Sequence, residues 1–106
     1  MVSNVVKRFK EARLPAGSSW HEVTDKDGRR WITSVNTKGG KWTFIVKEVE
    51  FKKDWMKYEL QVEEGSKKHR WPSLYTREAE AKKEAEIWAQ AVKTKGPQPL
   101  TGWKPV

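Results

Sequence analysis

Cysteine is absent from this chain of 106 residues, and histidine occurs only twice. The absence of cysteine excludes disulfides, thiolate-ligated zinc and a thiol nucleophile, and two histidines cannot form a three-histidine metal site. Long apolar runs are missing too: no stretch of apolar residues exceeds three, whereas roughly 20 are needed to span a bilayer. We therefore expect no membrane span, no metal and no cofactor.

An apolar segment of the kind found in secretory signals is also missing from the first residues, so we expect a cytoplasmic protein. What the chain has in excess is positive charge, because 22 Lys and Arg against 14 Asp and Glu give a net charge of +8. Charged residues make up 34% and apolar residues 36%, which is the balance of a globular domain. The length suits one domain, which we place at residues 1–95, followed by a proline-rich extended tail at residues 96–106.

The middle of the chain has the alternation and composition of β-strands. Turn signals such as Asp27-Gly28 and Gly39-Gly40 separate segments rich in β-branched and aromatic residues. Connections this short make neighbouring strands antiparallel, so we expect a four-stranded meander. The four predicted strands are residues 20–24, 30–37, 41–51 and 55–64.

Two helices are expected around this sheet. Residues 3–13 carry an apolar stripe at helical spacing and end before Pro15. A longer stripe follows Thr76, a suitable N-cap, and stops at Gly96. The sequence thus predicts an α+β domain with a short N-terminal helix, a four-stranded antiparallel β-meander and a C-terminal helix packed across one face of the sheet.

Positive charge is unevenly distributed along the chain. Residues 41–64 have a net charge of −1, whereas residues 65–75 carry 3 basic and no acidic side chains. Because alternate turns of a meander lie at the same end, two basic turns should come together there with flanking aromatic residues. Basic groups interleaved with aromatic rings can hold a phosphate backbone and stack bases. The predicted nucleic-acid-binding residues are Lys38, Lys41, Trp42, Lys67, Lys68, Arg70 and Trp71.

The opposite end of the meander is expected to gather a second set of basic residues. The outward face of the sheet, in contrast, should carry acidic side chains, which would repel phosphate. The end of the sheet is therefore favoured over its face as a site for a polyanion. The second basic set is Lys26, Arg29, Arg30, Lys52 and Lys53, and the acidic residues expected on the outward face are Glu48, Glu50, Glu59 and Glu63.

Seven tryptophans are more than a core of this size needs. Trp88 lies on the apolar stripe of the second helix and is expected in the core, and Trp31 and Trp42 are expected in the core or at its rim. Exposed tryptophans are favoured at binding hot spots. For the four other tryptophans two alternatives stay open, packing at the rim of the core or exposed contact with a partner: Trp20, Trp55, Trp71 and Trp103.

Residues 41–92 resemble known folds. The strings KWTFIVKEV, WMKYELQVEEG and RWPSLYTREAEAKKEAEIWAQAV resemble the strand–strand–helix ending of small phage-encoded proteins and, more distantly, plant AP2 and phage-integrase arm-type DNA-binding domains. Trp42 matches the first aromatic residue of those domains, and Leu74, Thr76 and Glu78 fall near their helix-entry motif. The resemblance implies DNA binding and, for a phage protein, the host cytoplasm. Those domains read a groove with the free sheet face, where Glu59 is expected here.

No reaction is evident from the residues. His21 lies near Ser18 and Ser19, but the strand–turn–helix elbow that exposes a nucleophilic serine is not present around them. We expect a small non-enzymatic protein that contacts nucleic acid or another polyanion through the basic end of its sheet. The alternative is a phage-type accessory protein that binds and modulates a host protein through exposed tryptophans and charged surfaces. Basic patches with exposed tryptophans suit an acidic protein partner. Association of two copies through an edge strand is a third possibility.

Overall fold

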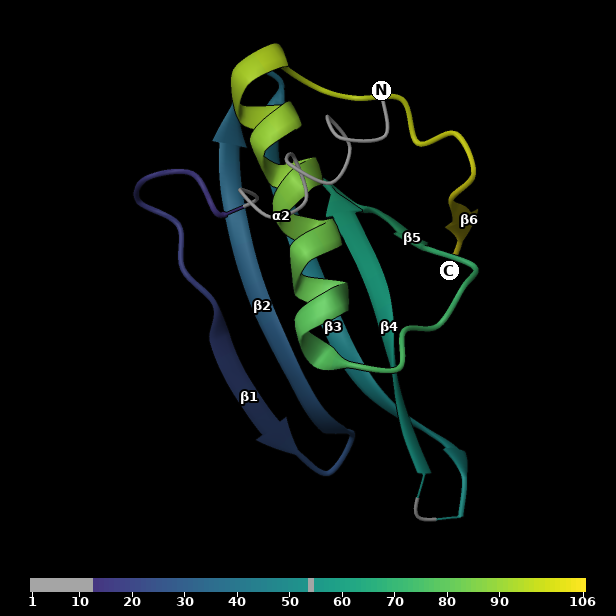
Figure 1. Cartoon of the computed structure of the whole chain (residues 1–106). Coiled ribbons are helices and arrows are strands. Elements are labelled where there is room, and N and C mark those ends of the chain that lie inside the picture. The colour runs from purple at the N-terminus through teal and green to yellow at the C-terminus, as the bar shows by residue number, and fades with distance from the viewer. Residues whose placement is uncertain (1–12, 54) are drawn as a thin grey trace, which may run out of the picture.

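The computed structural model describes residues 13–53 and 55–106, which form one antiparallel sheet with a helix across one face (Figure 1). The described strands are β1 (His21–Asp25), β2 (Gly28–Thr37), β3 (Gly40–Lys52), β4 (Trp55–Glu64), β5 (Lys67–Arg70) and β6 (Lys104–Pro105). They follow one another across the sheet in chain order. The helix, α2 (Glu78–Lys95), contacts β2, β3 and β4, and β1 lies beside the area it covers.

The predicted α+β class and antiparallel meander are confirmed, but the sheet is larger than four strands. β5 has the sequence KKHR, which offers no apolar alternation, and β6 comprises two residues of the tail that was expected to be extended. The tail pairs with β5, and the Val106 N–H donates to the Lys68 carbonyl at 3.0 Å. The helix expected over residues 3–13 lies outside the described residues, apart from Arg13, which is not helical.

Helix α2 begins at Glu78, and its N-cap residue is Arg77 rather than the expected Thr76. The Thr76 hydroxyl donates to the Glu80 carboxylate at 3.1 Å, and within the described residues no backbone N–H of the first turn donates to it. At the other end, Gly96 has a φ of 87°, a left-handed conformation that glycine adopts without strain. The predicted stop of the helix is therefore confirmed, whereas its cap is not.

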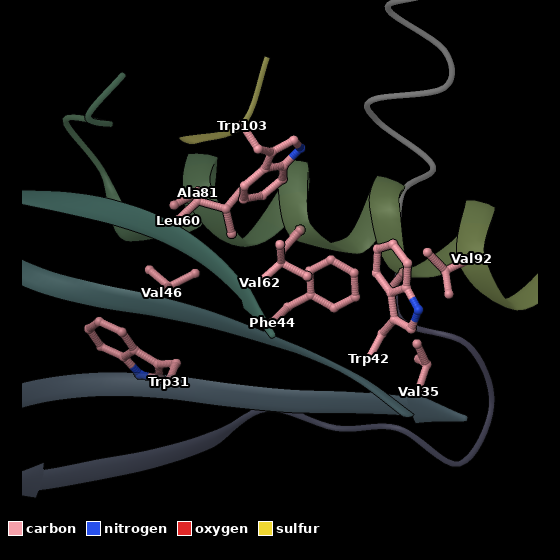
Figure 2. Close-up of a cluster of buried hydrophobic side chains, with 12 residues drawn as sticks. Trp31, Val35, Trp42, Phe44, Val46, Leu60, Val62, Ala81, Val92 and Trp103 are labelled. Atoms are coloured by element: carbon pink, nitrogen blue, oxygen red, sulfur yellow. The ribbon is translucent and has the colours of Figure 1, made fainter. Parts of the chain in front are cut away.

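Large aromatic rings from the sheet pack against small residues of the helix in the core (Figure 2). Ala81, Ala85 and Ala89 are fully buried, and their small size lets α2 approach the sheet closely. Each large apolar side chain buried in such a core contributes about 1.5–3 kcal/mol. The sheet contributes Trp31, Val35, Trp42, Phe44, Val46, Leu60 and Val62.

Trp103 brings the tail into this core. Its side chain is 6% exposed, and its ring lies edge-on to Trp71 and Trp88, with centroids 5.3 and 5.5 Å away. Gly102 fits beside the Trp71 ring, because a Cβ at this position would lie 3.4 Å from it. Of the two alternatives for Trp103, the structure shows packing.

The sheet has two faces, which alternate along every strand. Trp42, Phe44 and Val46 point toward α2 and define the helix face, and the residues between them define the open face. Because paired residues point to the same side, the register assigns a face to each residue of the neighbouring strands. Of the described elements, none lies on the open face.

Candidate nucleic-acid interface

The two turns that carry the predicted lysines lie at the same end of the sheet. Glu64 lies between Trp42 on β3 and Lys67 on β5, so the β2–β3 and β4–β5 turns are adjacent. The tail reaches this end as well, because Lys104 lies opposite Arg70. We call the following residues the basic end: Lys38, Lys41, Lys67, Lys68, Arg70 and Lys104.

Alternation along β5 divides the basic end between the two faces. Lys68 and Arg70 point to the open face, as does Lys104, which is paired with Arg70. Lys67 and His69 point to the helix face, where His69 is half-buried and its Nδ1 atom has no hydrogen-bond partner in the part of the chain that the structure describes. The open face therefore holds most of the positive charge on β5 and β6.

Acidic residues offset this charge only in part. Glu63 lies opposite Lys68, and Glu64 lies opposite Lys67, so six basic side chains stand against two acidic ones, a net charge of +4. The last turn of α2 adds to it, because the Lys93 Nζ atom lies 3.5 Å from the Asn36 carbonyl at the end of β2. The structure thus adds Lys104 and Lys93 to the five basic residues of the predicted site.

Neither tryptophan of the predicted site is placed to stack on a base. Trp42 is 1% exposed and lies beneath α2 in the core. Trp71 is half-buried, with its ring against Trp103. Trp42 alternates with Phe44 and Val46 in the sequence, and this shared face already indicates burial. The basic end therefore offers phosphate contacts without an exposed aromatic ring.

Two of the four acidic residues expected on the outward face lie on the helix face. Glu48 is opposite Tyr58 and Glu50 is opposite Met56, in register with the strand positions that face α2. Arg29 donates to the Glu48 carboxylate at 3.1 Å, and this hydrogen bond raises the pKa of the guanidinium. The acidic sheet face expected from the sequence is therefore wrong in half of its members.

The remaining acidic residues of the open face lie next to basic ones. Glu59 lies opposite Lys47, just as Glu63 lies opposite Lys68. Asp25 accepts two hydrogen bonds from Arg30, at 3.1 and 3.2 Å, and they hold the pKa of its carboxyl below the usual value. The open face as a whole carries more basic than acidic side chains. The basic ones are Arg30, Lys41, Lys47, Lys57, Lys68, Arg70 and Lys104, and the acidic ones are Asp25, Glu59 and Glu63.

The second basic set, at the opposite end, is partly neutralised. Arg30 is paired with Asp25, and Arg29 is paired with Glu48 and, at 4.0 Å, with Glu22. Lys26, Lys52 and Lys53 are exposed in the turns. This end has less uncompensated charge than the basic end.

Features of a catalytic or metal site are weak. Ser19 Oγ and His21 Nε2 lie 3.4 Å apart at the exposed start of β1, and Ser18 instead donates to the Ser34 carbonyl. Among residues 13–53 and 55–106, no acceptor holds the second ring nitrogen of His21, and no group of three or more His, Asp or Glu could bind a metal ion. No helix within the described residues is long and apolar enough to cross a membrane.

Comparison with known proteins adds no assignment to these observations. No family model matches the chain, and neither a curated protein nor a solved structure matches it.

Proposed function

We propose that this protein binds nucleic acid through the basic end of its sheet and that it is a binding protein rather than an enzyme. The observation that carries the proposal is the pairing of β5 with β6. This pairing sets Lys104 opposite Arg70, on the same face as Lys68, although Lys104 is distant in the sequence. Three side chains with fixed neighbours on adjoining strands form a denser positive surface than separate lysines in mobile turns would.

Phosphate is the chemistry that such a surface suits. Arg70 can hold a phosphate in a bidentate manner, and lysines act as point charges around it. For the alternative of a host-protein partner we expected a surface of several exposed tryptophans beside an acidic sheet face. Glu48 lies on the other side of the sheet, against Arg29, and Trp55 is the one exposed tryptophan of the seven, all of which the structure describes. We therefore favour nucleic acid over an acidic protein partner, because the tryptophan-rich surface expected for such a partner is not formed by the described residues.

Salt dependence tests the proposal. Binding of a labelled single-stranded oligonucleotide, followed by fluorescence anisotropy, should weaken with salt, and four phosphate contacts give a log–log slope of about −3. The double variant Lys68→Gln, Arg70→Gln should reduce both the affinity and the slope. The matched control is Lys26→Gln, Lys83→Gln, which removes the same charge from exposed positions away from the basic end and should change the slope little. No binding at low salt would contradict the proposal.

A further inference from the structure

The β3–β4 hairpin carries the one exposed tryptophan of the seven, all of which lie within the described residues. Trp55 is 50% exposed, whereas the other six are buried or half-buried. The hairpin extends beyond the first turn of α2 (Figure 1), so its tip stands away from the core. We propose that Trp55 is a stacking platform for a base of single-stranded nucleic acid whose phosphates run along the open face toward the basic end. This inference deepens the proposed function and rests on it.

Positive charge surrounds the Trp55 ring. The Lys52 and Lys57 ammonium groups lie 5.6 and 5.8 Å from its centroid, within the range of a cation–π contact. Lys53 is exposed in the adjoining turn. Lysines this close to a ring can contact the phosphates on either side of a stacked base, which is the combination that single-strand-binding surfaces use.

Trp55 lies on the open face of the sheet, as do Lys68 and Arg70 of the basic end. Trp55, Lys57, Glu59 and Gln61 alternate with the helix-face residues of β4, and Gln61 is opposite Arg70. With a rise of about 3.4 Å per residue, the distance along the strand from Trp55 to Gln61 is roughly 20 Å. One strand of nucleic acid of several nucleotides can therefore reach both ends of the open face.

Basic residues also occupy the space between the two ends. Lys47 is opposite both Arg30 and Glu59 in the middle of the face, so each acidic side chain on the path has a lysine across from it. The charge along the path is thus compatible with a phosphate backbone. This differs from the acidic face expected from the sequence, and the difference comes from Glu48 and Glu50 pointing the other way.

The surroundings of the ring favour nucleic acid over a lipid surface. Among the apolar side chains of the tip that the structure describes, Met56 is 36% exposed and lies on the helix face, so it does not form one apolar wedge with Trp55. Insertion into a membrane interface needs a continuous apolar surface. A single ring with flanking ammonium groups instead matches the alternating rings and charges of a nucleotide strand.

The experiment compares two polyanions, only one of which has bases. Wild type, Trp55→Ala, Trp55→Phe and the matched control Met56→Ala are titrated into labelled oligo(dT) of about ten nucleotides, with long-chain polyphosphate as the base-free competitor. Trp55→Ala should weaken oligo(dT) binding about 5- to 150-fold and leave polyphosphate binding within about twofold. Trp55→Phe should recover part of the loss, and Met56→Ala should behave as wild type.

The outcomes separate this inference from the proposed function. If the wild type binds both polyanions and Trp55→Ala binds oligo(dT) equally well, the stacking role is wrong and the basic end stands. If the wild type binds neither at low salt, the proposed function itself fails. A Trp55→Ala variant that loses binding to phosphatidylserine vesicles but keeps oligo(dT) binding would identify the tip as a membrane contact and overturn the inference.

Discussion

The fold alters the ionisation of Tyr75. Burial, followed by the negative charges of Glu84 and Glu80, raises the pKa of its hydroxyl to about 12. Its backbone pairs with Tyr58 in both directions, at 2.8 and 2.9 Å, which holds the residue beside β4. The tyrosinate is therefore disfavoured in the folded protein relative to the unfolded chain.

We predict that this difference makes stability fall between pH 10 and about 12. The unfolded chain loses the Tyr75 proton near pH 10, whereas the folded protein keeps it until about pH 12, so unfolding releases a proton in this window. The slope should lie below the limit of about 1.4 kcal/mol per pH unit for one proton, because the ring is partly solvated. Urea unfolding across this range measures it. Tyr75→Phe should have a shallower pH dependence, and an unchanged one would contradict the prediction.

At the same scale, the tryptophans show what a sequence can and cannot predict. Alternation with Phe44 and Val46 places Trp42 on a buried face, and that burial could be predicted from the sequence. Trp55 and Trp71 lie next to strand ends. There, alternation predicts the face of the sheet on which a side chain lies but not whether another part of the chain covers it. Trp71 is covered because the tail brings Trp103 onto it, and Trp55 is exposed because the hairpin extends past α2.

At the scale of the element, the tail holds the edge of the sheet, because β6 pairs with β5 and Trp103 is buried in the core. Trp103→Ala should lower the free energy of unfolding by about 3–5 kcal/mol, as for other large aromatic residues removed from a core. Loss of the ring should also release β6, so the Val106 N–H that donates to Lys68 should exchange faster with solvent. Denaturant unfolding and amide hydrogen exchange measure the two effects.

The control for Trp103→Ala is Thr101→Ala. Thr101 is an exposed residue of the same tail, and its replacement should change the free energy of unfolding by less than about 0.5 kcal/mol. A loss below about 1 kcal/mol for Trp103→Ala would mean that the tail contributes little to the fold. Neither β5 nor β6 could be predicted from its own residues. KKHR lacks an apolar pattern, and Pro105 argues against a strand, so both depend on partners that only the folded chain supplies.

For the whole molecule, strands β1 to β4 and the C-terminal helix follow from local patterns, whereas the distribution of charge over the surface does not. A shift of one residue in the strand register moves every side chain of the strand to the other face of the sheet. The register therefore decides whether Glu48 lies on the open face, where it would repel a polyanion, or pairs with Arg29 beside the core. The Lys26-Asp27 turn sets the β1–β2 register, and the irregularity between Glu50 and Lys52 changes the register at the tip of the β3–β4 hairpin. The sign of the net charge on the open face can therefore be predicted only once the register is known.

The arrangement of Trp55 and the basic end at opposite ends of one face makes affinity depend on ligand length. A short oligo(dT) can engage one end at a time, whereas a longer one joins both, so that the second contact becomes intramolecular. Affinity should rise steeply with length until the strand spans the roughly 20 Å between Trp55 and Gln61 and should then level off, within the about 4–16 nucleotides that single-strand-binding domains cover. Anisotropy titrations with a series of oligo(dT) lengths measure this dependence.

In Trp55→Ala the steep rise of affinity with length should be lost, because only the basic end remains to bind the strand. An affinity that already levels off at two or three nucleotides would show that the two ends do not act on one strand.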